Sequence, residues 1–316
     1  MWQLFQFPLC PFSRKVRLLL GEKGVGYELV RESPWNRRDE FLDMNPTGQT
    51  PVMADQARSI LLIDSMAICE YLEETVEKAA MLNGTATNRA EIRRLVTWFD
   101  THFYRDVTGP LLHERMIKRV AHRAAPDARG LREAMKAAVG HLDYIDYLLD
   151  HRNWLAGATM SLADLAAAAQ ISVADYLGGI DWKGHEQTAR WYRGLKSRPS
   201  FRPLLSERME KRIAHGAAPE ARVLRESMKA AIRHLDYTDY LLDHRQWLGG
   251  ATMSLADLAA AAQISVADYL GGIDWKGHEQ TARWYRGLKS RPSFRPLLSE
   301  RMEMVSPPSH YDNVDF

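Results

Sequence analysis

The first part of the chain alternates between short apolar runs and helical spacing, which predicts strands separated by helices. Residues 2–7 alternate large apolar and polar side chains like a half-buried strand, and a proline-containing break leads into a helix over about 13–22. The pattern continues with a strand over 27–31, a helical or irregular segment over 39–44, a hairpin over 52–54 and 60–63, and a helix over 66–76. This βαβαββα order predicts an α/β domain over residues 1–79.

From Asn88 onward the apolar residues recur at helical spacing, which predicts an all-α domain over residues 88–206. Pro110 is expected to bend or restart the first long helix. A further helix is expected to begin at Ser161, because Asp164 stands three residues later, as in a capping box. The residues that follow are small and apolar nearly all round, so this helix must be buried.

An internal repeat lengthens the helical part of the chain. Residues 157–210 reappear unchanged at 250–303, a shift of 93 positions, and residues 114–156 align with 207–249 with mostly conservative differences. The repeat predicts a duplicated all-α module over 207–303, followed by a flexible tail over 304–316. Recombination between related copies explains one identical and one divergent half.

The second copy has no counterpart of residues 88–110, so part of its apolar face must be covered from elsewhere. Either copy could dock on the α/β domain, with the other looped out or exchanged with a second chain, which favours a homo-oligomer. Closing a shorter loop costs less entropy, so the first copy is expected to dock.

Two short stretches predict a pocket for a peptide-like ligand. Thr50-Pro51 follows a turn and opens a strand, so its X-Pro bond is a candidate cis bond that directs the N–H and C=O of Thr50 toward a ligand. Asp64-Ser65 precedes a helix, which places Ser65 at the N-cap, where backbone donors face an anion. Thr50, Pro51, Asp64 and Ser65 are therefore the candidate ligand-binding residues.

Cys10 is the candidate reactive residue. It precedes a helix, whose N-terminus favours a thiolate, and Arg14 and Lys15 add positive charge. Ser13 stands where a second, resolving cysteine would be, so the thiol would act alone. The alternative is that Cys10 carries no chemistry. Cys69 lies within an apolar helical stripe and is expected in the core.

The cis-proline loop and the acidic-Ser pair together resemble the thioredoxin-like domain of glutathione transferases, in which these elements hold glutathione. The capping box at Ser161 resembles that of the buried sixth helix of the same proteins. The resemblance implies a glutathione transferase fold: an α/β thioredoxin-like N-terminal domain, an all-α C-terminal domain and here a duplicated all-α module. It also implies glutathione as a candidate ligand.

Composition narrows the function classes. The formal net charge of +2 argues against a nucleic-acid partner, and no apolar run is long enough for a membrane span. The chain starts like a strand rather than a signal peptide, and two cysteines fit a reducing cytoplasm. The eleven histidines show no metal-ligand spacing. We therefore expect a cytoplasmic protein without a metal.

The tail combines one proline pair with Tyr311, Val314 and Phe316, which indicates a docking peptide of unknown target or a segment that folds back onto its own domain. Four segments are similar to the FtsZ-localised protein A family of alphaproteobacteria: PLCPFSRKVR at 8–17, WFD at 98–100, KSRPSFRPLL at 196–205 and HYDNVDF at 310–316. The resemblance covers residues 1–209 and the tail, and the duplication departs from it. It implies a cell-division protein that binds FtsZ filaments at the division site.

Two functions are therefore in competition. The family resemblance and the aromatic tail favour a scaffold that binds FtsZ, regulates constriction and requires no cofactor; the alternative is a glutathione-dependent transferase or thiol transferase that uses Cys10. The candidate partner-binding residues are Leu111, Leu112, Glu114 and Lys118, which combine leucines expected to be exposed with alternating charge, together with Tyr311 and Phe316 of the tail. The alternative for both leucines is a place in the core.

Overall fold

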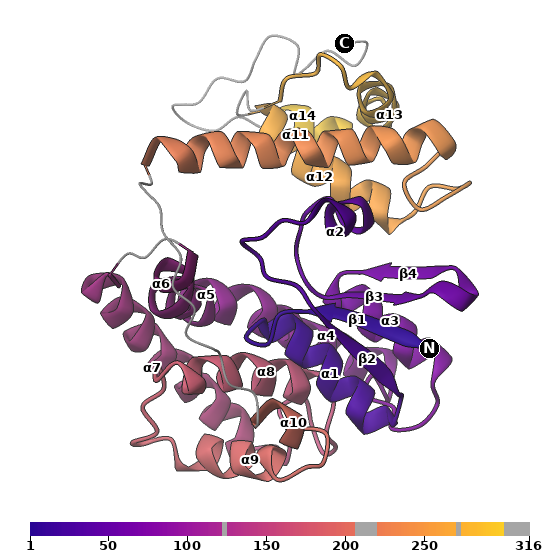
Figure 1. Cartoon of the computed structure of the whole chain (residues 1–316). Coiled ribbons are helices and arrows are strands. Elements are labelled where there is room, and N and C mark those ends of the chain that lie inside the picture. Colours follow the sequence, from indigo (N-terminus) through magenta and orange to yellow (C-terminus); the bar gives the residue numbers. More distant parts are fainter. Residues whose placement is uncertain (122–124, 206–219, 270–272, 300–316) are drawn as a thin grey trace. The chain divides into compact units, whose positions relative to one another are not determined.

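The structure is a computed structural model that describes residues 1–121, 125–205, 220–269 and 273–299. The chain forms two compact units, Met1–Ala218 and Pro219–Phe316, which are described separately (Figure 1). The predicted module boundary at 207 and the tail, with Tyr311 and Phe316, lie outside the described residues.

The N-terminal part of the first unit is a four-stranded sheet with strand order β2-β1-β3-β4, in which β1 runs parallel to β2 and the other neighbours are antiparallel. The strands are β1 (Trp2–Gln6), β2 (Tyr27–Arg31), β3 (Val52–Asp55) and β4 (Ile60–Ile63). The intervening helices are α1 (Pro11–Lys23), α2 (Asp39–Met44), the 3-10 turn η1 (Gln56–Arg58) and α3 (Ser65–Thr75). This arrangement confirms the predicted βαβαββα order.

The first long helix runs on past Pro110. It comprises α4 (Ala86–Thr97), the π-helical η2 (Trp98–Thr108), α5 (Gly109–Leu112), the π-helical η3 (His113–Ile117) and α6 (Lys118–Ala121). The Gly109 N–H donates to the Tyr104 carbonyl five residues back, and Pro110 has no N–H to satisfy. The expected restart is therefore a change of hydrogen-bond register at Gly109, where the backbone torsions stay helical.

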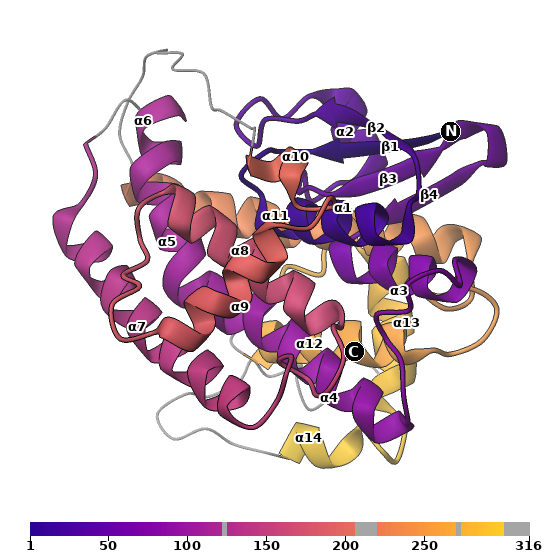
Figure 2. The same cartoon turned by 90° about the horizontal axis from the view of Figure 1, so that it is seen from below.

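The remaining helices of the first unit build a bundle around one buried helix. They are α7 (Ala128–Asp150), α8 (Leu162–Tyr176), α9 (Glu186–Lys196) and α10 (Arg202–Leu205). Every residue of α8 from Leu162 to Ala174 is buried, because α1, α4 and η2 pack against it (Figure 2). The capping box is confirmed, since the Ser161 N–H donates to the Asp164 carboxylate over 2.9 Å.

The second unit contains α11 (Glu220–His244), α12 (Leu255–Tyr269), α13 (Glu279–Lys289) and α14 (Arg295–Ser299). Its core is small and aromatic, with buried Tyr269, Trp284, Tyr285, Leu288, Phe294 and Leu298 around Ala261. Among the described helices, none has the length and apolar content that crossing a bilayer demands.

Candidate functional site

The strand register brings three separate segments to one edge of the sheet. Val52 pairs with Ile63 in the β3–β4 hairpin and with Phe5 of β1. Thr50-Pro51, just before β3, therefore lies beside Asp64, just after β4, and beside the loop that leaves β1 and carries Cys10. The Thr50-Pro51 bond is cis, as expected.

Cys10 is the N-cap residue of α1, and the residue is 9% exposed. Its Sγ donates to the Thr50 carbonyl over 3.3 Å and accepts from the Ser13 N–H over 3.5 Å. The sequence did not predict this pairing of Cys10 with Thr50. It links the candidate nucleophile directly to the candidate ligand-binding loop.

The two cations expected to favour the Cys10 thiolate are engaged elsewhere. Lys15 is fully buried and forms an ion pair with Asp100 of η2. Arg14 donates to the Pro8 carbonyl and to Ser172 of α8, each over 2.8 Å. These side chains therefore fasten α1 to the helical bundle.

Asp64, not Ser65, caps α3. The Asp64 Oδ1 accepts hydrogen bonds from the N–H groups of Met66 over 2.6 Å and Ala67 over 3.3 Å, and Ser65 is the first helical residue. The prediction for Ser65 was wrong by one position, because the carboxylate in front of it reaches the second and third helical N–H groups. These two donors are consequently not free to face an anion.

At the same edge, two polar groups of the predicted ligand-binding residues remain available. The Thr50 carbonyl accepts from Cys10, whereas the Thr50 N–H makes no hydrogen bond to the described part of the chain. Asp64 is exposed and Ser65 is buried. One backbone donor and one exposed carboxylate are therefore available here, and the ligand-binding role of these residues stays a prediction.

An apolar and aromatic wall adjoins Cys10, and most of it was not predicted. Buried members of this cluster are Phe7, Leu9, Cys10, Leu112, Met116 and Val173. Trp35 meets Phe7 with ring centroids 5.5 Å apart, and Tyr104 meets Phe12 at 4.8 Å. Burial raises the pKa of Tyr104, and nearby Cys10 adds to this rise. A signal was present, because Tyr104, Leu112 and Met116 recur at multiples of four along one helix.

The predicted partner-binding residues are not an exposed surface. Leu111 is 0% and Leu112 is 6% exposed, so the expectation that they are exposed was wrong. The reason is that the helix continues through Pro110, so the face that points to the core stays on the core side. Leu111 packs in the main core and Leu112 beside Cys10.

Glu114 is bonded to the start of α7, and Lys118 is paired with Glu114. The Glu114 carboxylate accepts from the Lys118 Nζ over 2.8 Å and from the Asp127 N–H over 2.7 Å. Burial alone would raise the pKa of Glu114, but these hydrogen bonds outweigh it and lower that pKa. The partner-binding role of both residues stays a prediction.

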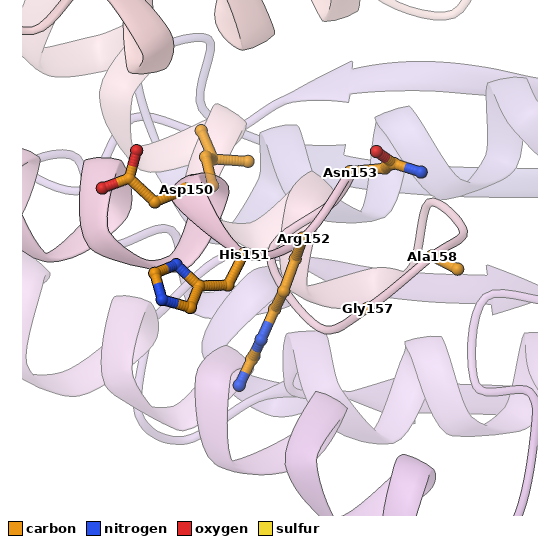
Figure 3. A pocket seen from close by; sticks show the side chains of 7 residues that line it. Asp150, His151, Arg152, Asn153, Gly157 and Ala158 are labelled. Carbon is orange, nitrogen blue, oxygen red and sulfur yellow. The ribbon is translucent and has the colours of Figure 1, made fainter.

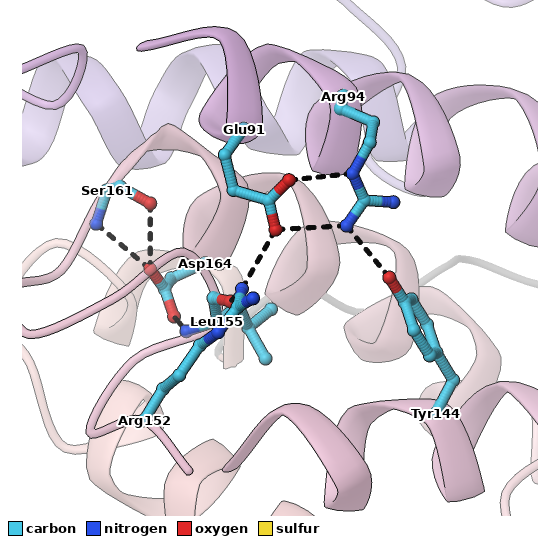
Figure 4. Close-up of polar contacts among 7 residues, drawn as sticks. All are labelled: Glu91, Arg94, Tyr144, Arg152, Leu155, Ser161 and Asp164. Atoms are coloured by element: carbon cyan, nitrogen blue, oxygen red, sulfur yellow. Dashed lines mark hydrogen bonds and ion pairs between the residues drawn. The ribbon is translucent and has the colours of Figure 1, made fainter. Parts of the chain in front are cut away.

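A cavity of about 420 Å³ lies at the connection between α7 and α8 (Figure 3). Its lining residues are Leu149, Asp150, His151, Arg152, Asn153, Gly157 and Ala158, none of which was a predicted site residue. Arg152 donates to Glu91 of α4 over 2.9 Å and to the Leu155 carbonyl over 2.7 Å, and Arg94 donates to both Glu91 and Tyr144 (Figure 4). Because Arg152 is hydrogen-bonded to Glu91 of α4 and to the Leu155 carbonyl, we interpret this region as one that stabilises the fold.

Comparison with known proteins places the fold and the family. Residues 9–75 match the family model of the glutathione S-transferase N-terminal domain. A solved glutathione S-transferase from Rhodospirillum rubrum F11 is 47% identical with a TM-score of 0.64, over 66% of this chain and 94% of that chain. Glutathione S-transferase GstB of Escherichia coli K12 is 27% identical over 61% of this chain and 91% of its own length.

FtsZ-localized protein A of Caulobacter vibrioides is more similar than the E. coli enzyme. It is 44% identical over 220 residues, which are 69% of this chain and 94% of that protein. The structure of FzlA from C. crescentus is 32% identical with a TM-score of 0.53, over 100% of this chain and 99% of that chain. On this evidence, the chain belongs to the FtsZ-localized protein A family.

Proposed function

We propose that this protein is a cytoplasmic cell-division scaffold that binds FtsZ filaments at the division site and regulates constriction. The observation that carries the proposal is the match to FtsZ-localized protein A, which extends over 94% of that protein at 44% identity. The match to the E. coli transferase has similar coverage of its relative but only 27% identity. Of these two relatives, which share the fold, the more similar one is the division protein; the solved glutathione S-transferase from Rhodospirillum rubrum, at 47% identity, supports the second candidate function described below.

The edge of the sheet is consistent with a role that needs no cofactor. The Cys10 thiol and the Thr50 carbonyl are bonded to each other, and Asp64 caps α3. These groups therefore contribute to the fold without a ligand. A filament-binding scaffold requires only this fold and an outer surface.

Co-sedimentation with FtsZ tests the proposal. We expect the protein to pellet with FtsZ polymerised by GTP and to stay in the supernatant with unpolymerised FtsZ. If the protein is absent from the pellet at every FtsZ concentration, the proposed function is contradicted. The Glu114→Lys variant tests the predicted surface, and Glu114→Gln is its matched control, because the amide oxygen can still accept from the Asp127 N–H.

A second candidate function is glutathione-dependent transfer or thiol transfer that uses Cys10. It is favoured by the position of Cys10 at the α1 N-cap, within 3.3 Å of the loop that offers the Thr50 N–H. Retention on a glutathione column, together with conjugation of a model electrophile that Cys10→Ala abolishes, would support this function. Retention without Cys10-dependent turnover would indicate a binding site only.

A further inference from the structure

Helix α12 carries the same fifteen residues as α8, but several of its apolar side chains are exposed. The exposed fractions in α12 are 79% for Leu255, 42% for Leu258 and 59% for Val266; their counterparts in α8 are Leu162 at 0%, Leu165 at 1% and Val173 at 0%. Identical residues thus lie in a core in one copy and on a surface in the other.

Five of the exposed residues of α12 form one continuous apolar stripe. Leu255, Leu258, Ala259, Ala262 and Val266 are all exposed and recur at helical spacing, and we call them the α12 stripe. None of the five is charged. The two acidic residues of α12 are buried instead: Asp257 accepts from Leu248 and Trp284 over 2.9 and 3.0 Å, and Asp268 from Trp275 over 3.0 Å. Nothing within the stripe would repel a second, identical stripe.

The cover that this face receives in the first copy exists only once per chain. In α8 it consists of α1, α4 and η2, which span residues 11–23 and 86–108. The repeat begins after these residues, so the second copy has no counterpart of them. Exchange of the two copies between chains does not change this ratio. Each chain still contains two helices of the α8 type, α8 and α12, and one set of the covering elements α1, α4 and η2. One stripe per chain therefore remains without this cover.

We propose that the α12 stripe is a self-association surface, which packs against the α12 stripe of a second copy of this chain. A twofold arrangement places identical patches face to face, which requires each patch to be complementary to itself. The uncharged stripe meets this requirement. Its central alanines, Ala259 and Ala262, allow the two helices to approach closely, at the short end of the usual axial separation of about 8–10 Å.

The size of the stripe sets the strength of the association. A helix of fifteen residues is about 22 Å long and a contact face is about 10 Å wide, which gives a footprint of roughly 200 Å². Stable complexes bury about 800 Å² per partner. Because the footprint is well below that size, we expect a weak dimer that forms only at high protein concentration. This inference goes beyond the proposed function and does not depend on it.

Sedimentation velocity over a wide concentration range tests the proposal with the full chain. The wild type is expected to shift from monomer to dimer as its concentration rises. Leu258→Lys should weaken this association at least tenfold without changing the melting temperature, because the side chain is already exposed. The matched control is Ile232→Lys, which changes an exposed apolar residue of α11 outside the stripe and should leave association unchanged.

Disulfide trapping locates the contact. Ala262→Cys places a thiol in the middle of the stripe, and mild oxidation should join two chains through it. Arg283→Cys, at an exposed position of α13, controls for random collision. The native Cys10 and Cys69 are buried, so the wild type gives the background level. Equal cross-linking of the two variants would overturn the proposal.

Two other outcomes also overturn it. One is a wild type that stays monomeric at every concentration. The other is a Leu258→Lys variant that melts earlier yet associates normally, since the stripe would then be covered within its own chain. In that case the cover is the tail if deletion of residues 304–316 reproduces the earlier melting, and exchange with α8 if it does not.

Discussion

The two copies of the repeat have the same local structure but different surroundings. The same hydrogen bonds recur in both: Leu155 and Trp191 to Asp164 at 3.0 and 3.0 Å, Leu248 and Trp284 to Asp257 at 2.9 and 3.0 Å, His185 with Asp146 at 2.8 Å, and His278 with Asp239 at 2.9 Å. These bonds join residues within one copy, so the sequence of the module is enough to specify them.

The copies differ wherever the partner lies outside the repeat. Arg198 and Ser200 bind Glu22 of α1, but the second copy has no counterpart of Glu22 for Arg291 and Ser293. His141 is buried against Trp98, whereas His234 at the same position is exposed. The comparison shows that the module contains its own polar clusters, while the burial of its central helix depends on α1, α4 and η2.

The largest expected effect is a difference between two equivalent leucines. Leu162→Ala removes a fully buried side chain and should lower the free energy of unfolding by about 3 kcal/mol. Leu255→Ala changes the same residue of the second copy, which is 79% exposed, and should change it by less than about 0.5 kcal/mol. Urea unfolding curves of both variants measure the difference. Equal losses would show that α12 is covered as well as α8.

A smaller effect is expected at Glu22. Its carboxylate accepts from Arg198 over 2.7 Å and from Ser200 over 2.5 Å. Burial alone would raise the pKa of Glu22, but these bonds outweigh it and lower that pKa. Glu22→Gln should therefore lower the free energy of unfolding by about 1–2 kcal/mol at neutral pH, because Arg198 is partly exposed.

The pH dependence of this loss has a defined sign. Because the folded pKa is lowered, the stabilisation is complete above the unfolded value of about 4.3 and disappears as pH falls through the folded pKa. The wild type and Glu22→Gln should thus converge in acid. Arg291→Ala, the change at the Arg198 position of the second copy, is the control and should have no such effect. A constant difference at all pH values would contradict the ion pair.

The contribution of His141 to the pH dependence of the free energy of unfolding is expected to be smaller still. Burial lowers the pKa of His141, while Asp106, whose Oδ2 lies 3.4 Å from the Nε2, partly opposes this. The Nδ1 accepts from the Trp98 Nε1 over 3.2 Å, which requires the neutral ring. The neutral His141 ring therefore stabilises the folded state. This contribution to the free energy of unfolding should be complete above the unfolded pKa of about 6.5 and should decline below it, by less than about 1 kcal/mol.

NMR titration measures this directly. The His141 midpoint should lie below about 6.5, and Trp98→Phe should raise it by removing the donor to the Nδ1. A midpoint above that value would show that Asp106 keeps the ring charged in the folded state.

The smallest expected effect concerns Cys10. Cys10→Ala should leave FtsZ binding unchanged, because a scaffold requires the fold rather than the thiol. Cys69→Ala is a control for the loss of a buried sulfur, since burial raises the pKa of the Cys69 thiol to about 12 and makes it unreactive. Filament pelleting of both variants, with melting curves, decides the matter. Loss of binding by Cys10→Ala at unchanged stability would give the thiol a role.

Features with strong local signals could be predicted from the sequence. The alternation of apolar and polar residues and the positions of the prolines predict the order of elements and the cis bond at Pro51. The spacing of Ser161 and Asp164 predicts the capping box. Each of these depends on residues that are neighbours in the chain. The distinction between Asp64 and Ser65 as the cap was missed because both residue types suit that position.

The arrangement of the candidate site was harder to predict, because it combines distant segments. Contact of Cys10 with Thr50 depends on the sheet register, and Tyr104 reaches the Cys10 region from η2. The burial of Leu111 and Leu112 depends on the helix continuing through Pro110. The sequence favoured a break at this position, because proline usually interrupts a helix. The exposure of the α12 stripe follows from what the repeat omits.

The comparison of the copies predicts that the first unit, without the second copy of the repeat, is sufficient for FtsZ binding. The most direct test is co-sedimentation with FtsZ polymers of the chain lacking residues 207–299, beside the full chain. This deletion removes one copy and joins Ser206 to Glu300. We predict that the shortened protein binds FtsZ polymers within about twofold of the full chain, a difference below about 0.5 kcal/mol. Loss of binding by a shortened protein that remains folded would contradict the account.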